Sequence, residues 1–110
     1  MFVQVASEAE ISEGQVKGAE AEGVDIVVTR VQGELFAVDG ICTHVLAFLS
    51  DGEMDGFEIV CPLHAGAFDV RNGFATRDPC VDPLKCYPIR IENGAVFVDV
   101  EHPREGGPAR

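Results

Sequence analysis

The chain has 110 residues, of which 46% are hydrophobic, which excludes a disordered protein and fits one domain with a modest core. Its 8 basic and 19 acidic residues give a formal net charge of −11, which argues against nucleic acid or an anionic membrane as a partner and suits a basic protein partner. No apolar run approaches the ~20 residues of a membrane span, and the first residues lack signal-peptide features, so we expect a cytoplasmic protein.

The first half of the chain predicts a β meander that ends at Asp39-Gly40. Residues 7–25 are rich in acidic residues and glycine, which predicts a solvated turn region with one short strand. The turn signal Gln32-Gly33 follows a continuous β-branched run and predicts a hairpin. The strands expected in this half are residues 2–5, 24–31 and 34–38.

The second half predicts short strands separated by glycine-containing turns. Asn72-Gly73 and Asn93-Gly94 predict hairpin turns, the first of type I′. Asp51-Gly52 and Asp55-Gly56 predict tight turns, and the two prolines within residues 77–83 predict a stiff loop. The strands expected in this half are residues 57–60, 67–70, 74–75, 86–91 and 95–100.

No helical periodicity of useful length occurs, so the expected fold class is all-β. We expect a single domain over residues 1–101 and a flexible C-terminal tail over residues 102–110, which contains two prolines and two glycines. His102 is expected to be a plain surface histidine. The chain has no glycine-rich phosphate loop and no nucleotide fingerprint.

Two short clusters carry the metal-binding residue types of this chain. Cys42-Thr43-His44 and Cys61-Pro62-Leu63-His64 are separated by sixteen residues. Together they supply two thiolates and two imidazoles, which suit a tetrahedral zinc ion or a 2Fe–2S cluster with mixed ligands. Zinc modules usually keep like ligands together, whereas each cluster here has one ligand of each kind, and a two-iron cluster can use that arrangement.

This C-x-H and C-x-x-H pattern resembles the signature of Rieske iron–sulfur proteins. The flanking residues are similar to those of the Rieske-type ferredoxins of bacterial aromatic-ring-hydroxylating dioxygenase systems, from residue 2 to about 101. The resemblance implies a Rieske fold, with short antiparallel sheets and an inserted cluster-binding subdomain at about residues 40–76. The similar segments are residues 40–44, 50–52, 61–73 and 83–88.

The resemblance also implies the ligands and the function. Cys42 and Cys61 would bind the inner iron of a Rieske 2Fe–2S cluster, and His44 and His64 the outer iron. The chain would then be an electron carrier and not an enzyme, taking single electrons from a flavin-containing reductase to the terminal oxygenase. An oxygen-activating iron would need two further histidines and a carboxylate, and only His102 remains.

Two alternatives to this function stay open at the level of the sequence. One is a Rieske subunit or electron donor of another redox system, such as a nitrite-reductase-like assembly. The other is a zinc-stabilised interaction module without a redox role. The sequence does not indicate the substrate of the system, the oligomeric state or the type of reductase.

A reduction potential in the negative part of the Rieske range, roughly −150 to +300 mV, is expected. High-potential Rieske proteins carry a disulfide between the ligand loops, and the corresponding positions here look like Ala47 and Leu63. Those proteins also donate hydroxyl hydrogen bonds to the cluster, and Gly66 and Phe68 stand at these positions. Fewer donors stabilise the electron-rich state less.

We expect the histidine side of the centre to face solvent and to dock on the oxygenase and the reductase. Val45, Leu46 and Phe48 are apolar residues beside His44. They predict an apolar ring around the two histidines, with Pro79 at its edge.

Cys80 and Cys86 lie outside the ligand pattern. Because thiols stay reduced in a cytoplasm, both are expected to pack as small hydrophobic side chains and not as a disulfide.

Overall fold

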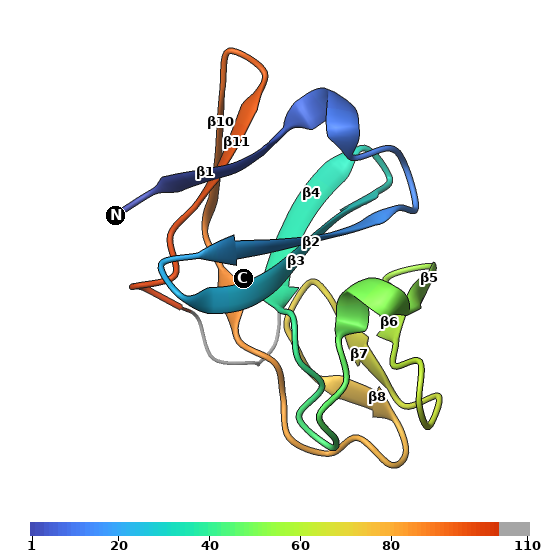
Figure 1. Cartoon of the computed structure of the whole chain (residues 1–110). Coiled ribbons are helices and arrows are strands. Elements are labelled where there is room, and N and C mark those ends of the chain that lie inside the picture. Colours follow the sequence, from blue (N-terminus) through green and yellow to red (C-terminus); the bar gives the residue numbers. More distant parts are fainter. Residues whose placement is uncertain (104–110) are drawn as a thin grey trace.

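The computed structural model describes residues 1–103, and this part of the chain folds into three antiparallel sheets and two 3₁₀ helices (Figure 1). The all-β expectation is confirmed, whereas the tail beyond residue 103 lies outside the described residues. The helices are η1 (Glu8–Glu10) and η2 (Leu49–Asp51). The first sheet has the order β1 (Val3–Ser7), β11 (Ala95–Val98), β10 (Ile89–Glu92). The second has the order β2 (Val16–Ala21), β3 (Val24–Val31), β4 (Glu34–Asp39), β9 (Cys86–Tyr87). The third has the order β5 (Glu53–Asp55), β6 (Glu58–Val60), β7 (Ala67–Asp69), β8 (Ala75–Arg77).

Two-residue turns with two left-handed residues connect the long hairpins. Gln32-Gly33 and Asn93-Gly94 have positive φ at both positions, as type I′ turns require, and both expected hairpins are confirmed. Glu22-Gly23 makes a third turn of this kind. It connects β2 to β3, which pair over six residues, so the segment expected to be a turn region with one short strand holds a strand of six residues.

The type I′ turn expected at Asn72-Gly73 is wrong, because only Gly73 has a positive φ, of 81°. The connection between β7 and β8 is longer than two residues. The amide of Gly73 donates to the carbonyl of Asp69 at 2.7 Å, and the Asn72 side-chain oxygen accepts from the amide of Phe74 at 2.9 Å. The asparagine therefore closes a local side-chain turn in place of a tight hairpin.

The strand expected over residues 86–91 is divided at Pro88 between two sheets. β9 pairs with β4, and β10 pairs with β11. Proline has no amide hydrogen to give to a sheet ladder, so the chain changes partners at this residue. The division places one continuous segment along the edges of both sheets.

The second sheet is buried on both faces, and this explains the continuous apolar run of β3. Ile26 and Val28 belong to a core shared with the first sheet. Val27 and Val31 belong to a second core, which contains Cys42, Cys61 and the third sheet. Both ligand clusters thus pack against the same face of the second sheet, through Cys42 and Cys61.

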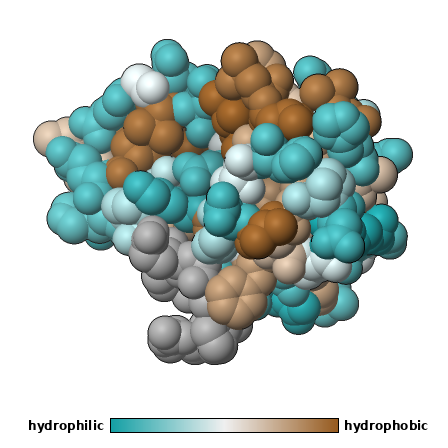
Figure 2. Space-filling view, turned by 90° about the horizontal axis from the view of Figure 1, so that it is seen from below, coloured by the Kyte–Doolittle hydropathy of each residue, from teal (hydrophilic) through white to brown (hydrophobic). Residues whose placement is uncertain are grey.

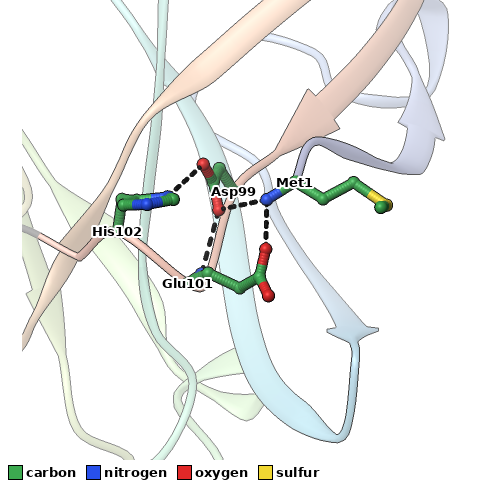
Figure 3. Close-up of polar contacts among 4 residues, drawn as sticks. All are labelled: Met1, Asp99, Glu101 and His102. Carbon is green, nitrogen blue, oxygen red and sulfur yellow. Dashed lines mark hydrogen bonds and ion pairs between the residues drawn. The ribbon is translucent and has the colours of Figure 1, made fainter.

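The two ends of the described chain are joined through Asp99 (Figure 3). Its carboxylate accepts from the Met1 ammonium at 3.1 Å and contacts Nδ1 of His102 at 2.8 Å. Glu101 also pairs with the Met1 ammonium. His102 is exposed, as expected, but it is a hydrogen-bond partner of Asp99 and not an isolated surface residue.

Candidate metal centre

Three loops meet at the lower end of the molecule in Figure 1. The first follows β4 and is closed by a hydrogen bond from the Cys42 amide to the Ala47 carbonyl, at 3.0 Å. The second joins β6 to β7 and is closed by a bond from the Cys61 amide to the Gly66 carbonyl, at 2.7 Å. A third loop, between β8 and β9, is tied to the first where the Thr43 hydroxyl donates to the Asp82 carbonyl at 2.7 Å.

The two cysteines of the ligand pattern lie inside the protein. Cys42 is 4% exposed and Cys61 2%, and both belong to the core beneath the third sheet. Burial by itself would raise the pKa of the Cys42 thiol, but the amides of Val45 and His44 and the thiol of Cys61 hold this pKa below its usual value. The loop therefore favours a thiolate at Cys42, which is the form that binds metals.

The two histidines lie outside the cysteines, side by side at the surface. His44 and His64 are both exposed, and their ring centroids are 5.5 Å apart with an angle of 72° between the ring planes. Each ring comes from a different loop, so the pair depends on the packing of the two loops. Both rings are accessible to solvent in the part of the chain that the structure describes.

This donor set fits a two-iron cluster with mixed ligands better than a single ion. Sulfur donors gather on the buried side and nitrogen donors on the exposed side, as two irons with different ligands require. Across residues 1–103, no group of three or more His, Cys, Asp or Glu side chains is arranged to hold one metal ion. The four residues singled out from the sequence lie as two buried thiols, Cys42 and Cys61, and two adjacent exposed imidazoles, His44 and His64.

Cys80 is the residue of this centre that the sequence does not reveal. It is 5% exposed, and its Sγ lies 3.7 Å from Sγ of Cys42. Burial and the neighbouring sulfur of Cys42 raise the pKa of the Cys80 thiol to about 12. The spacing of Cys80 from the two motifs follows no ligand pattern. The fold of the third loop brings it to this position. Cys80 and Cys86 are both reduced and buried, as expected.

The apolar residues around the histidines differ in part from the expected ring. Leu46 is 87% exposed and Phe48 52%, but Val45 is half-buried because it packs against the core. Pro79 is half-buried. Figure 2 shows this end of the molecule, where hydrophobic side chains form patches between hydrophilic ones.

Two further exposed apolar side chains lie on the same loops. Leu63 is 60% exposed and sits next to His64, and Val81 is 76% exposed and follows Cys80. Their exposure could not be read from their neighbours in the sequence.

No helix in the described part of the chain is long and apolar enough to cross a membrane.

Comparison with known proteins gives consistent similarities. The family model described as the Rieske [2Fe-2S] domain matches residues 1–88. The ferredoxin component of the naphthalene 1,2-dioxygenase system of Pseudomonas putida is 41% identical over 99 residues, which cover 90% of this chain and 95% of that protein. The solved structure of the Sphingomonas yanoikuyae B1 ferredoxin matches with a TM-score of 0.86 and 38% identity, over 90% of this chain and 98% of that one.

A solved complex is also similar. A chain in the complex of reduced oxygenase and oxidized ferredoxin in carbazole 1,9a-dioxygenase matches with a TM-score of 0.83 and 33% identity. The match covers 88% of this chain and 91% of that chain.

Proposed function

Because the chain belongs to the Rieske [2Fe-2S] domain family, we propose that it is the ferredoxin of an aromatic-ring dioxygenase system. It carries single electrons from a flavin-containing reductase to the terminal oxygenase and is not itself an enzyme. The names of the similar proteins support the dioxygenase system over other redox systems. The observation that carries the proposal is the arrangement of two buried thiols behind two exposed imidazoles.

Four side chains hold the Rieske 2Fe–2S cluster in this proposal. Cys42 and Cys61 bind the inner iron, and His44 and His64 bind the outer iron. The cluster supplies reversible one-electron chemistry. Its binding part corresponds to about residues 40–76 of a single domain at 1–101. The position of both loops between β4 and β9 supports this division.

The protein residues give the centre one dry side and one exposed side. The core around Cys42 and Cys61 excludes water from the sulfur ligands, and this stabilises the buried half of the proposed cluster site. His44 and His64 reach the surface, where their imidazoles can approach a partner closely. Electrons therefore enter and leave on the histidine side.

The partners dock on the apolar side chains around His44 and His64 in this proposal. Leu46 is the most exposed of these side chains, Val45 and Pro79 are half-buried, and Leu63 and Val81 extend the surface beyond the ring expected from the sequence. Small contacts of this kind suit transient redox complexes, which must also separate quickly. In this proposal the ferredoxin acts in the cytoplasm, where thiols such as those of Cys80 and Cys86 stay reduced.

Electron paramagnetic resonance of the reduced protein tests the proposed ligands. Mixed nitrogen and sulfur ligation lowers the average g value relative to a cluster bound by four thiolates. His64→Cys is expected to move the spectrum toward the four-thiolate form or to abolish cluster binding. His102→Ala is the matched control, because His102 lies at Asp99 on another part of the surface, and it is expected to leave the spectrum unchanged.

Iron and sulfide analysis tests the proposal as a whole. We expect about two irons and two acid-labile sulfides per chain. A protein that contains neither, even after anaerobic refolding with both, would overturn the proposed function. A colourless protein with one bound zinc would favour the interaction module.

A further inference from the structure

The Cys80 thiol makes a contact that the proposed cluster ligands do not explain. Its Sγ lies 3.7 Å from Sγ of Cys42, within the distance of a sulfur–sulfur hydrogen bond. The residue is 5% exposed and belongs to the same core as Cys42 and Cys61. It comes from the third loop, which carries none of the four proposed ligands.

The backbone of the second loop makes room for this thiol. A Cβ added at Gly66 would lie 2.4 Å from Sγ of Cys80 and 3.3 Å from its backbone nitrogen. The space beside Gly66 is therefore filled by the side chain of Cys80. The third loop is tied to the first where Thr43 donates to Asp82, and within itself the Cys80 amide donates to the carbonyl of Arg77, at the end of β8, at 3.2 Å.

We propose that the Cys80 thiol donates a hydrogen bond to the Cys42 sulfur and thereby raises the reduction potential of the centre. This inference rests on the proposed function, in which the Cys42 sulfur is an iron ligand. An iron-bound thiolate has no proton, so it can only accept, and a thiol buried among apolar groups keeps its proton. The direction of the hydrogen bond from Cys80 to Cys42 is therefore fixed.

The effect on the potential follows from where the added electron goes. Reduction makes the cluster and its sulfur ligands more negative, so a donor to a ligand sulfur stabilises the reduced state more than the oxidised state. Cys80 acts through Cys42 and touches no partner. It supplies a donor on the buried side, where Gly66 and Phe68 supply no hydroxyl.

Midpoint potentials of the cluster-loaded protein test this inference. Cys80→Ala is expected to lower the potential, with up to about a tenfold change in the ratio of reduced to oxidised protein at fixed ambient potential, or about 59 mV. Cys80→Ser keeps a donor and is expected to restore part of the difference. Cys86→Ala also removes a buried thiol from the same core, and it is expected to leave the potential at the wild-type value.

The infrared S–H band gives a direct signature of the bond. In the loaded protein only Cys80 and Cys86 keep a thiol hydrogen, so the two alanine variants assign the two bands. The Cys80 band is expected to shift further on reduction than the Cys86 band. Gly66→Ala is expected to displace the thiol and to lower the potential in the same direction as Cys80→Ala.

Two results would overturn the inference. One is a potential in Cys80→Ala equal to that of the wild type, and the other is an equal shift in Cys86→Ala. Both are read on protein that contains the cluster, so they leave the proposed function standing. Loss of iron from the wild-type protein would count against the proposed function instead.

Discussion

At the scale of single residues, Leu46 gives the clearest test of docking. It is the most exposed of the large apolar side chains in residues 1–103, and it lies two positions from His44. Leu46→Asp places an unpaired charge in the proposed contact, and desolvating that charge weakens both complexes. We expect electron transfer with the reductase and with the oxygenase to slow by about tenfold, which is about 1.4 kcal/mol.

Ile91→Asp is the matched control for this substitution. Ile91 is 45% exposed and lies on β10, in the sheet away from the ligand loops. Stopped-flow mixing with each partner measures both variants, and the control is expected to react at the wild-type rate. Unchanged rates for Leu46→Asp would remove this leucine from the docking surface.

The four proposed ligands could be predicted from the sequence, but Cys80 could not. The ligands follow a local spacing within each loop, which a linear pattern records. The contact of Cys80 with Cys42 spans 38 positions and depends on how the third loop packs. The exposure of Val45 was also unpredictable, because its two neighbours share its apolar character and only packing separates them.

At the scale of elements, the packing of β5 against β6 controls the second ligand loop. A Cβ added at Gly52 would lie 2.1 Å from the carbonyl oxygen of Val60, the residue before Cys61. Gly52→Ala must therefore move β6 and the start of the loop. We expect it to speed the loss of cluster absorbance on warming and to lower the stability by about 1–3 kcal/mol.

Gly56→Ala is the comparison for this variant, because it lies in the turn of the same hairpin. An added Cβ at Gly56 meets nothing within 4 Å, although its φ of 63° makes alanine strained by about 1–2 kcal/mol. We expect similar unfolding but a slower loss of the cluster than in Gly52→Ala. Equal rates of cluster loss in the two variants would mean that the Val60 carbonyl does not control the loop.

The tie between the two ends gives a pH-dependent contribution to stability. Burial would raise the pKa of Asp99, but His102, the Met1 ammonium and the Glu101 amide lower it to about 2. A lowered carboxyl pKa stabilises the fold above the unfolded value of 3.8, and this stabilisation is lost as the pH falls through about 2. The pKa of the Met1 ammonium is raised above 8.0, chiefly by Glu101 and then Asp99, so its contribution is full below that pH.

Asp99→Asn is therefore expected to lower the urea midpoint at neutral pH. The difference from the wild type is expected to be full at about pH 5 and to narrow as the pH falls below about 4. Far-ultraviolet circular dichroism follows the unfolding of both proteins. A difference that stays constant down to about pH 2 would contradict the assigned role of the Asp99 carboxylate.

Two of the three hairpins with two left-handed turn residues were the most predictable elements. Gln32-Gly33 and Asn93-Gly94 specify their turns locally, so tertiary structure did not alter them. The extent of β2 could not be predicted beyond one short strand within residues 7–25, because its pairing with β3 depends on the turn at Glu22-Gly23. The division of the expected strand at Pro88 could not be predicted either, since the apolar–polar alternation continues across Pro88 while the partner strand changes.

At the scale of the whole molecule, the net charge of −11 predicts how fast partners associate. An acidic carrier is attracted to a basic partner surface, and salt screens this attraction over about 10 Å at 0.1 M. We expect the association rate to fall as ionic strength rises. Asp82→Asn, in the third loop, is expected to lower the low-salt rate by roughly two- to fivefold and to weaken its salt dependence.

Glu22→Gln is the control for Asp82→Asn, because it removes one exposed charge in the turn between β2 and β3. It changes the net charge equally and is expected to leave the rate near the wild-type value. Equal effects of the two substitutions would indicate that total charge, and not charge near the ligand loops, steers association. Stopped-flow traces at several salt concentrations separate these outcomes.

The all-β class could be predicted from the whole sequence, whereas the layering of the sheets could not. A run such as β3 shows that both faces are buried, but it does not say what covers each face. The structure assigns one face to the terminal strands and the other to the ligand loops. This arrangement arises from contacts between residues far apart in the chain.

In the proposed function, the placement of both imidazoles on one exposed side means that both partners use the same face of the protein. An electron donor and an electron acceptor that bind the same face compete for it, so the protein has to release one before it binds the other. Turnover then depends on diffusion between encounters, and a large excess of either partner slows the complete system by occupying the carrier.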